Sequence, residues 1–107
     1  ESDASGYVPR GFGFSGSDEQ HKKIQDWLKY FDKNTISYFS KGGGGADIGP
    51  LHRQTGTPMF GLSIDGQKYF EMHHTAKDVF ELVNARELEL GTASMASLVY
   101  LIDKYGL

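Results

Sequence analysis

Two adjacent histidines, His73 and His74, are the residues of this sequence best suited to binding chemistry. Neutral imidazole is the commonest transition-metal ligand in proteins. The preceding residues, Lys68 to Met72, suit an extended strand, and Thr75 with Asp78 suits a helix N-cap followed by an acidic first turn. The pair is therefore predicted at the carboxyl end of a strand, just before a helix, at the sheet edge where ligand sites gather.

The two histidines are expected to play different parts. Side chains in an extended chain alternate between opposite faces, so His73 and His74 should not share one ion. One would bind, and its neighbour would serve another purpose. A pair of surface or packed histidines is the competing interpretation, and without other evidence it is the more frequent case.

A run of four glycines, Gly42 to Gly45, leads through Ala46 to Asp47. Bare backbone amides can approach an anion closely, so this run could form one wall of a substrate cleft. It lacks the Gly-Lys-Ser/Thr ending of a Walker loop and the spacing of a dinucleotide-binding loop. A plain flexible turn is an equally good interpretation.

Two helices are predicted to support these segments. Ser17 and Gln20 have the spacing of a capping box, and the helix from Ser17 to Lys33 should bury one apolar face. Asn84 and Glu87 form a similar cap pair for a helix from Ala85 to Tyr105. The expected buried face of this second helix consists of Leu88, Met95, Leu98, Val99, Ile102 and Tyr105.

The strands are predicted at Thr35–Ser40 and Pro58–Asp65, with a short helix from Asp47 to Gln54 between them. The apolar run of the second strand suits burial on both faces. Glu1 to Gly16 shows no usable periodicity and is expected to be irregular. Strands alternating with helices predict an α/β fold with a parallel or mixed sheet.

Composition limits the other possibilities. The chain has 107 residues, enough for one domain at most, and a net charge of -3 without a long block of either sign. No nucleic-acid or membrane-surface binding is therefore expected. No apolar run approaches the roughly 18 residues that span a bilayer. The absence of cysteine excludes disulfides and thiolate metal sites.

Five short motifs in order carry a resemblance to a known family. They are Glu1-Ser2-Asp3, Pro9-Arg10-Gly11-Phe12-Gly13-Phe14, Gly42–Asp47, Thr57-Pro58 and His73-His74-Thr75. The chain resembles the C-terminal part of the co-catalytic zinc exopeptidases of the aminopeptidase and carboxypeptidase Q type, the plasma glutamate carboxypeptidase family. The resemblance implies a partial three-layer α/β/α sandwich with a mostly parallel or mixed sheet. It also implies two bridged zinc ions and a glutamate as general base in the intact enzyme.

The resemblance assigns roles to individual residues. Asp3 matches the aspartate that ligates one zinc, and His74 matches the histidine that ligates the other. His73 occupies a position where some relatives carry a tyrosine that holds the tetrahedral intermediate, so it is a candidate oxyanion stabiliser. Gly44, Gly45 and Asp47 match the loop that lines the substrate cleft.

The chain also departs from the family. The family needs a His-x-Asp pair and an adjacent Glu-Glu pair, and neither occurs here. We therefore expect residues 1–107 to be the C-terminal portion of a catalytic domain, roughly its last third, inactive alone and with weak or no zinc binding. The expected activity of the whole enzyme is release of N-terminal residues or cleavage of dipeptides.

A non-catalytic binding module with a peptidase-like fold is the alternative, and an anion-binding domain built on the glycine loop is a third possibility. The expected partners are a peptide or dipeptide substrate and the remainder of the catalytic domain. Self-association is expected through an exposed sheet edge, at Pro58–Ile64 or Thr35–Phe39. Relatives are usually secreted or periplasmic, which suggests a compartment by resemblance only.

Overall fold

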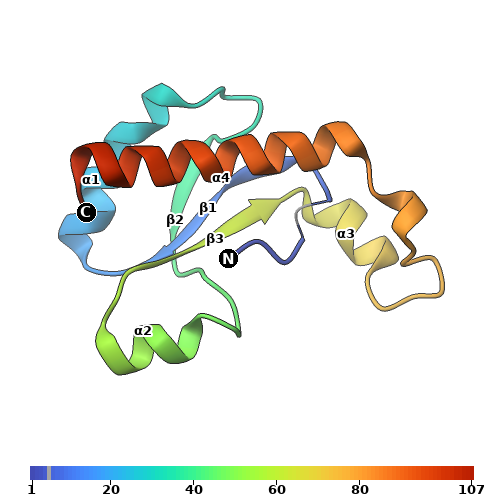
Figure 1. The fold of residues 1–107 in the computed structure, drawn as a ribbon, viewed down its shortest axis with the longest axis horizontal. Helices are drawn as coiled ribbons and strands as arrows, with labels where there is room; N and C mark the ends of the chain where they lie inside the picture. Colours follow the sequence, from blue (N-terminus) through green and yellow to red (C-terminus); the bar gives the residue numbers. More distant parts are fainter. Residues whose placement is uncertain (5) are drawn as a thin grey trace.

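The computed structural model describes residues 1–4 and 6–107 and is built on one three-stranded sheet (Figure 1). The central strand, β1 (Pro9–Ser15), pairs in parallel with β2 (Tyr38–Lys41) and antiparallel with β3 (Met59–Ile64). Helices precede or follow each outer strand, so the predicted α/β class with a mixed sheet is confirmed.

The prediction that Glu1 to Gly16 is irregular is wrong, because this segment contains the central strand. Phe12 and Phe14 alternate with glycines and are almost fully buried, at 0% and 2% exposure. A Cβ atom at Gly11 would lie 2.5 Å from the Tyr38 ring, and one at Gly13 would lie 2.6 Å from the carbonyl oxygen of Gly42. The two glycines therefore allow the Tyr38 ring and the glycine run to pack directly on the strand. They also interrupt the alternation of apolar and polar residues by which a strand is predicted from sequence.

The core lies where helices cover the phenylalanine face of the sheet. Helix α1 (Asp18–Gln25) begins with the predicted capping box between Ser17 and Gln20. It ends earlier than predicted and continues as the 3-10 helix η1 (Asp26–Tyr30). The buried apolar core consists of Phe12, Phe14, Ile24, Trp27, Ile36, Phe39, Phe60, Leu98 and Leu101.

The long helix α4 (Ala85–Tyr105) has the predicted bounds and the predicted Asn84 cap. The predicted buried face is confirmed at Leu98, and Met95 and Ile102 pack partly buried against the core, but Val99 is 62% exposed. The other buried positions of the helix are Gly91, Ser94 and Leu101. Small residues therefore occupy two of the four buried positions of the helix. None of the described helices has the length and hydropathy to cross a bilayer.

Strand β3 lies within the predicted range, but the prediction that it is buried on both faces is wrong. It is an outer strand in which Phe60 is buried and the other five residues are half-buried. Helix α2 (Gly49–Thr55) begins later than predicted, and its N-cap position is Ile48, not Asp47. Gly56 ends the helix as predicted, with φ 71° in the left-handed region that favours glycine.

Strand β2 begins three residues later than the predicted Thr35–Ser40, and Ile36 is instead buried in the connection before it. After β2 the glycine run crosses the face of the sheet that carries Gly13 and Gly61. A Cβ atom at Gly61 would lie 2.8 Å from the amide nitrogen of Gly44. Backbone therefore packs on backbone here, and the run is held against the sheet.

Candidate functional site

The histidine pair follows a helix, so the prediction of a strand at Lys68–Met72 is wrong. Helix α3 (Gly66–Met72) starts at Asp65, whose side chain accepts a hydrogen bond from the amide of Gln67 at 3.3 Å. Tyr69 and His73 stand one helical turn apart, with ring centroids 4.5 Å apart and the hydroxyl 3.3 Å from Nε2. This cap and this side-chain pair favour the helix over the extended form.

Thr75 does not begin a helix. Its hydroxyl donates to the carbonyl oxygen of Met72 at 2.7 Å, and the chain then turns toward the short 3-10 helix η2 (Phe80–Leu82). The threonine therefore closes α3 rather than opening a new helix. The capping-box spacing from Thr75 to Asp78 was the misleading signal.

The two histidines are in contact with each other. His73 is half-buried at the end of α3, whereas His74 is exposed and has φ 57°. Their ring centroids lie 3.8 Å apart, nearly edge to face. The expected separation onto opposite faces applied to a strand and does not occur at this helix end. Few residues other than glycine have a positive φ. Those that do are found more often than average at functional positions.

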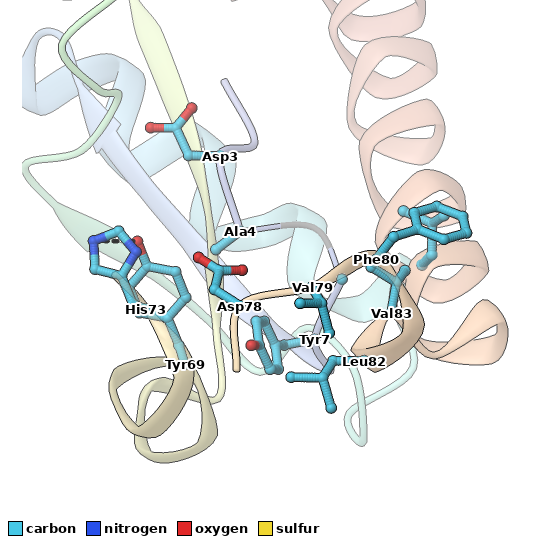
Figure 2. Close-up of a pocket in the computed structure, with 12 residues that line it drawn as sticks. Asp3, Ala4, Tyr7, Tyr69, His73, Asp78, Val79, Phe80, Leu82 and Val83 are labelled. Atoms are coloured by element: carbon cyan, nitrogen blue, oxygen red, sulfur yellow. Dashed lines mark hydrogen bonds between the residues drawn. The ribbon is translucent and has the colours of Figure 1, made fainter. Parts of the chain in front are cut away.

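A pocket of about 550 Å³ joins the first residues of the chain to this segment (Figure 2). Asp3, Tyr7, Tyr69, His73 and Asp78 supply its polar groups. Val79, Phe80, Leu82, Val83 and Leu88 supply its apolar side. The fold thus brings together the predicted zinc ligand Asp3 and the predicted oxyanion stabiliser His73, which are far apart in sequence.

The described lining of this pocket does not include His74, Gly44, Gly45 or Asp47. Their roles as zinc ligand and substrate wall remain predictions. Asp78 and Tyr7 do line it, and the sequence analysis missed both. Asp78 was interpreted as part of a helix cap, and Tyr7 lies in the segment that was expected to be irregular.

A second arrangement, the acidic cluster, consists of Glu1, Asp3 and Asp47, whose carboxylate oxygens all lie within 4.8 Å of one another. The amide of Ile48 donates to Oε2 of Glu1 at 3.3 Å. Oε1 of Glu1 is buried without a hydrogen-bond partner among the described residues. A Cβ atom at Gly45 would overlap the Glu1 carboxylate, so this glycine makes room for it.

The cluster shifts the acidities of two of its members in opposite directions. The hydrogen bond with Glu1, burial and the charges of Glu1 and Asp47 raise the pKa of Asp3 above its usual value. Burial opposes ionisation of Glu1, but the Ile48 amide and the hydrogen bond with Asp3 lower its pKa overall. Asp3 is therefore the member of the pair that retains its proton longer as the pH rises.

The cluster fits part of a cation site. Carboxylate oxygens are ligands for zinc and for hard cations, and a zinc ion in a protein normally has four ligands. In the part of the chain that the structure describes, no histidine joins the three carboxylates. The assignment of Asp3 and His74 to two different zinc ions stays a prediction.

No protein-family model matches the sequence, and no solved structure matches it. The sequence is similar to carboxypeptidase Q. The identity with the Bos taurus protein is 28% over 102 residues, which is 95% of this chain and 21% of that protein. The Homo sapiens protein is 28% identical over the same shares, and the Mus musculus protein is 26% identical over 95% of this chain and 22% of its own length.

The resemblance to carboxypeptidase Q-like exopeptidases is thus confirmed by whole-chain similarity. The chain spans about a fifth of the length of the curated relatives it matches.

Proposed function

We propose that residues 1–107 form the C-terminal portion of the catalytic domain of a zinc-dependent exopeptidase and are inactive in isolation. The observation that carries the proposal is the similarity to carboxypeptidase Q across 95% of the chain. The pocket that joins Asp3 to His73 supports it, because these are two of the residues to which the motifs assign catalytic roles.

The substrate proposed is a short peptide, and a dipeptide suits the observations best. The name carboxypeptidase denotes cleavage at a carboxyl terminus, whereas the aminopeptidase resemblance implies cleavage at an amino terminus. In a dipeptide the two classes of enzyme cut the same bond. The pocket volume of about 550 Å³ lies within the range of small-molecule sites.

Asp3 and His74 are the proposed zinc ligands, one for each ion of a pair. When bound, zinc supplies Lewis-acid activation of water and stabilises developing negative charge. Asp3 must be ionised to bind a cation, and its raised pKa makes binding compete with a proton at low pH. The Glu1 carboxylate beside it keeps the site negative.

His73 is the proposed oxyanion stabiliser. Its ring lies on the wall of the pocket, stacked on Tyr69 and within 3.3 Å of the tyrosine hydroxyl (Figure 2). These contacts fix the plane of the imidazole, so a ring N–H can be directed into the pocket. A donor that is oriented before the reaction stabilises developing charge most effectively.

The alternative is a non-catalytic binding module with a peptidase-like fold. Within the described residues, the one group of three or more potential metal ligands consists of the carboxylates Glu1, Asp3 and Asp47 and contains no histidine. The absence of the His-x-Asp and Glu-Glu pairs from the sequence also fits this alternative.

The test is a paired dipeptide-hydrolysis assay with zinc supplied. It compares the 107-residue chain with a longer protein that joins it to the remainder of a catalytic domain. In the longer protein, Asp3→Ala and His74→Ala should each lower kcat/KM at least about a hundredfold, or about 2.7 kcal/mol. His73→Ala should cost less, because it anchors no metal.

The control is Lys22→Ala, which removes an exposed side chain of α1 that lines neither this pocket nor the groove beside β3 and should leave the rate unchanged. Hydrolysis by the 107-residue chain alone would contradict its proposed inactivity. A longer protein indifferent to His74→Ala would contradict the ligand assignment, and one inactive in every form would favour the binding module.

A further inference from the structure

An apolar groove of about 260 Å³, here called the β3 groove, runs along the outer edge of β3 between α2 and α4. Its walls include Ile48, Leu51, Met59, Met95 and Val99. Leu51 is 54% exposed and Val99 is 62% exposed, although both are large apolar side chains. Exposed apolar side chains that gather in one groove beside a sheet edge give another chain a surface on which to pack.

The first residue of the chain shows which kind of chain fits. The Glu1 amino group donates to the carbonyl oxygen of Phe60 at 2.8 Å, and the Leu62 amide donates to the carbonyl oxygen of Glu1 at 2.9 Å. These two bonds flank Gly61, which is the pattern of a parallel ladder. Glu1 therefore lies on the outer edge of β3 in the parallel orientation, and Figure 1 shows the N-terminus beside this strand.

The direction of this pairing leads into the β3 groove. A strand parallel to β3 whose carboxyl end meets Glu1 must pass Pro58 and Met59, the residues that enter β3. Both residues line the groove, and so does Glu1. Backbone groups of such a strand would extend the ladder, while its side chains would fill the space between α2 and α4.

We propose that the β3 groove holds an extended apolar strand, parallel to β3, from polypeptide outside residues 1–107. The matched relatives have about four fifths of their length outside the similar region, so they contain chain that could supply it. That the strand belongs to the remainder of the catalytic domain rests on the proposed function. The groove and the ladder geometry do not depend on it.

A second copy of the chain suits the groove less well. Two β3 edges related by a two-fold axis would pair antiparallel, with the same residues meeting on each side. Glu1 already occupies the outward groups of Phe60 and Leu62, which such a pairing would need. The parallel strand uses the same edge without displacing Glu1.

The experiment joins an eight-residue extension of alternating Val and Thr to Glu1 of the 107-residue chain. The extension should raise Tm by at least about 4 °C and slow hydrogen exchange of the Phe60 amide. The same extension with Pro at alternate positions should raise neither, because proline cannot form the ladder. The experiment measures stability and hydrogen exchange but no catalytic activity. A negative result would therefore contradict the proposed strand without contradicting the proposed function.

Groove variants locate the effect. Val99→Asp should abolish the rise in Tm, because it places a charge in the β3 groove. Tyr100→Asp is the matched control, since Tyr100 is 59% exposed on the same helix but does not line the groove, and this variant should keep the rise. Both sites are exposed, so the chains without extension should fold, which circular dichroism checks.

The proposal would be overturned if the extension raised the Tm of Val99→Asp and Tyr100→Asp equally. It would also be overturned if the extended chain folded but had the same Tm as the chain without the extension. A chain that sediments as a dimer without the extension, and in which Val99→Asp restores the monomer, would assign the groove to a second copy and overturn the proposed occupant.

Discussion

Replacing Gly13 by alanine tests whether the glycine run is a packing element of the sheet. The new Cβ atom would lie 2.6 Å from the carbonyl oxygen of Gly42 and 2.8 Å from Cα of Gly43. Ordinary contacts between such atoms are about 3.5–4.0 Å, so the run must retreat by about 1 Å. Both neighbours are backbone atoms and cannot rotate away.

The retreat has a cost that follows from the hydrogen bonds holding the run. The Ser15 hydroxyl donates to the Gly43 carbonyl oxygen at 2.9 Å, and the Gly42 amide donates to the Phe14 carbonyl oxygen at 2.7 Å. Losing two bonds costs about 1 kcal/mol each, and overpacking adds about 1–3 kcal/mol. We expect the free energy of unfolding to fall by about 3–5 kcal/mol.

Urea unfolding followed by circular dichroism measures this change. Gly66→Ala is the control, because its Cβ atom would meet nothing nearer than 3.8 Å and the site begins α3. It should change the free energy of unfolding by no more than about 0.5 kcal/mol. If Gly13→Ala is as stable as Gly66→Ala, the run does not pack on β1, and its glycines need another explanation, such as approach to a ligand.

Two further predictions concern the core and the acidic cluster. Leu98→Ala should lower the free energy of unfolding by about 2–5 kcal/mol, because Leu98 is 2% exposed. Leu88→Ala, at a site that is 39% exposed, should lower it by at most about 1 kcal/mol. Equal losses would contradict the observed buried face of α4. Asp3→Asn should raise Tm at pH 7, because the raised pKa of Asp3 means that its ionised form opposes folding. The stability contributed by Asp3 is complete below its unfolded pKa of about 3.9 and is lost as the pH rises through the folded pKa. The difference in Tm between Asp3→Asn and the unchanged chain should therefore vanish below about pH 3.9. A difference in Tm that stays constant across pH would contradict the raised pKa of Asp3.

Regular local signals made several elements predictable from the sequence. The Ser17 and Asn84 caps are short-range hydrogen bonds, and both occur as expected. The α/β class followed from the alternation of elements. The end of α2 at Gly56 was also predictable, because it depends on the left-handed backbone conformation of this one glycine.

The missed elements depend on particular side-chain contacts rather than on residue preferences. Strand β1 was missed because Gly11 and Gly13 interrupt its pattern of apolar residues, and these two glycines make room for the Tyr38 ring and the glycine run. The α3 segment was misassigned because a tyrosine and a histidine one turn apart can support a helix that their individual preferences do not predict. The pocket could not be read from spacing, since its polar residues come from the N-terminal segment, α3 and the turn after it.

The β3 edge connects the proposed chemistry to the proposed docking surface. Glu1 is held on β3 by two backbone hydrogen bonds, one to Phe60 and one from Leu62, and Asp3 follows two residues later. A strand in the β3 groove would continue that ladder up to Glu1 and so reduce the motion of the backbone that carries Asp3. Because a metal ligand is effective only when it is held in position, occupation of the groove would orient Asp3, the proposed ligand, as well as cover the apolar walls. The 107-residue chain alone would then lack part of the support for Asp3, besides the ligands that it does not supply.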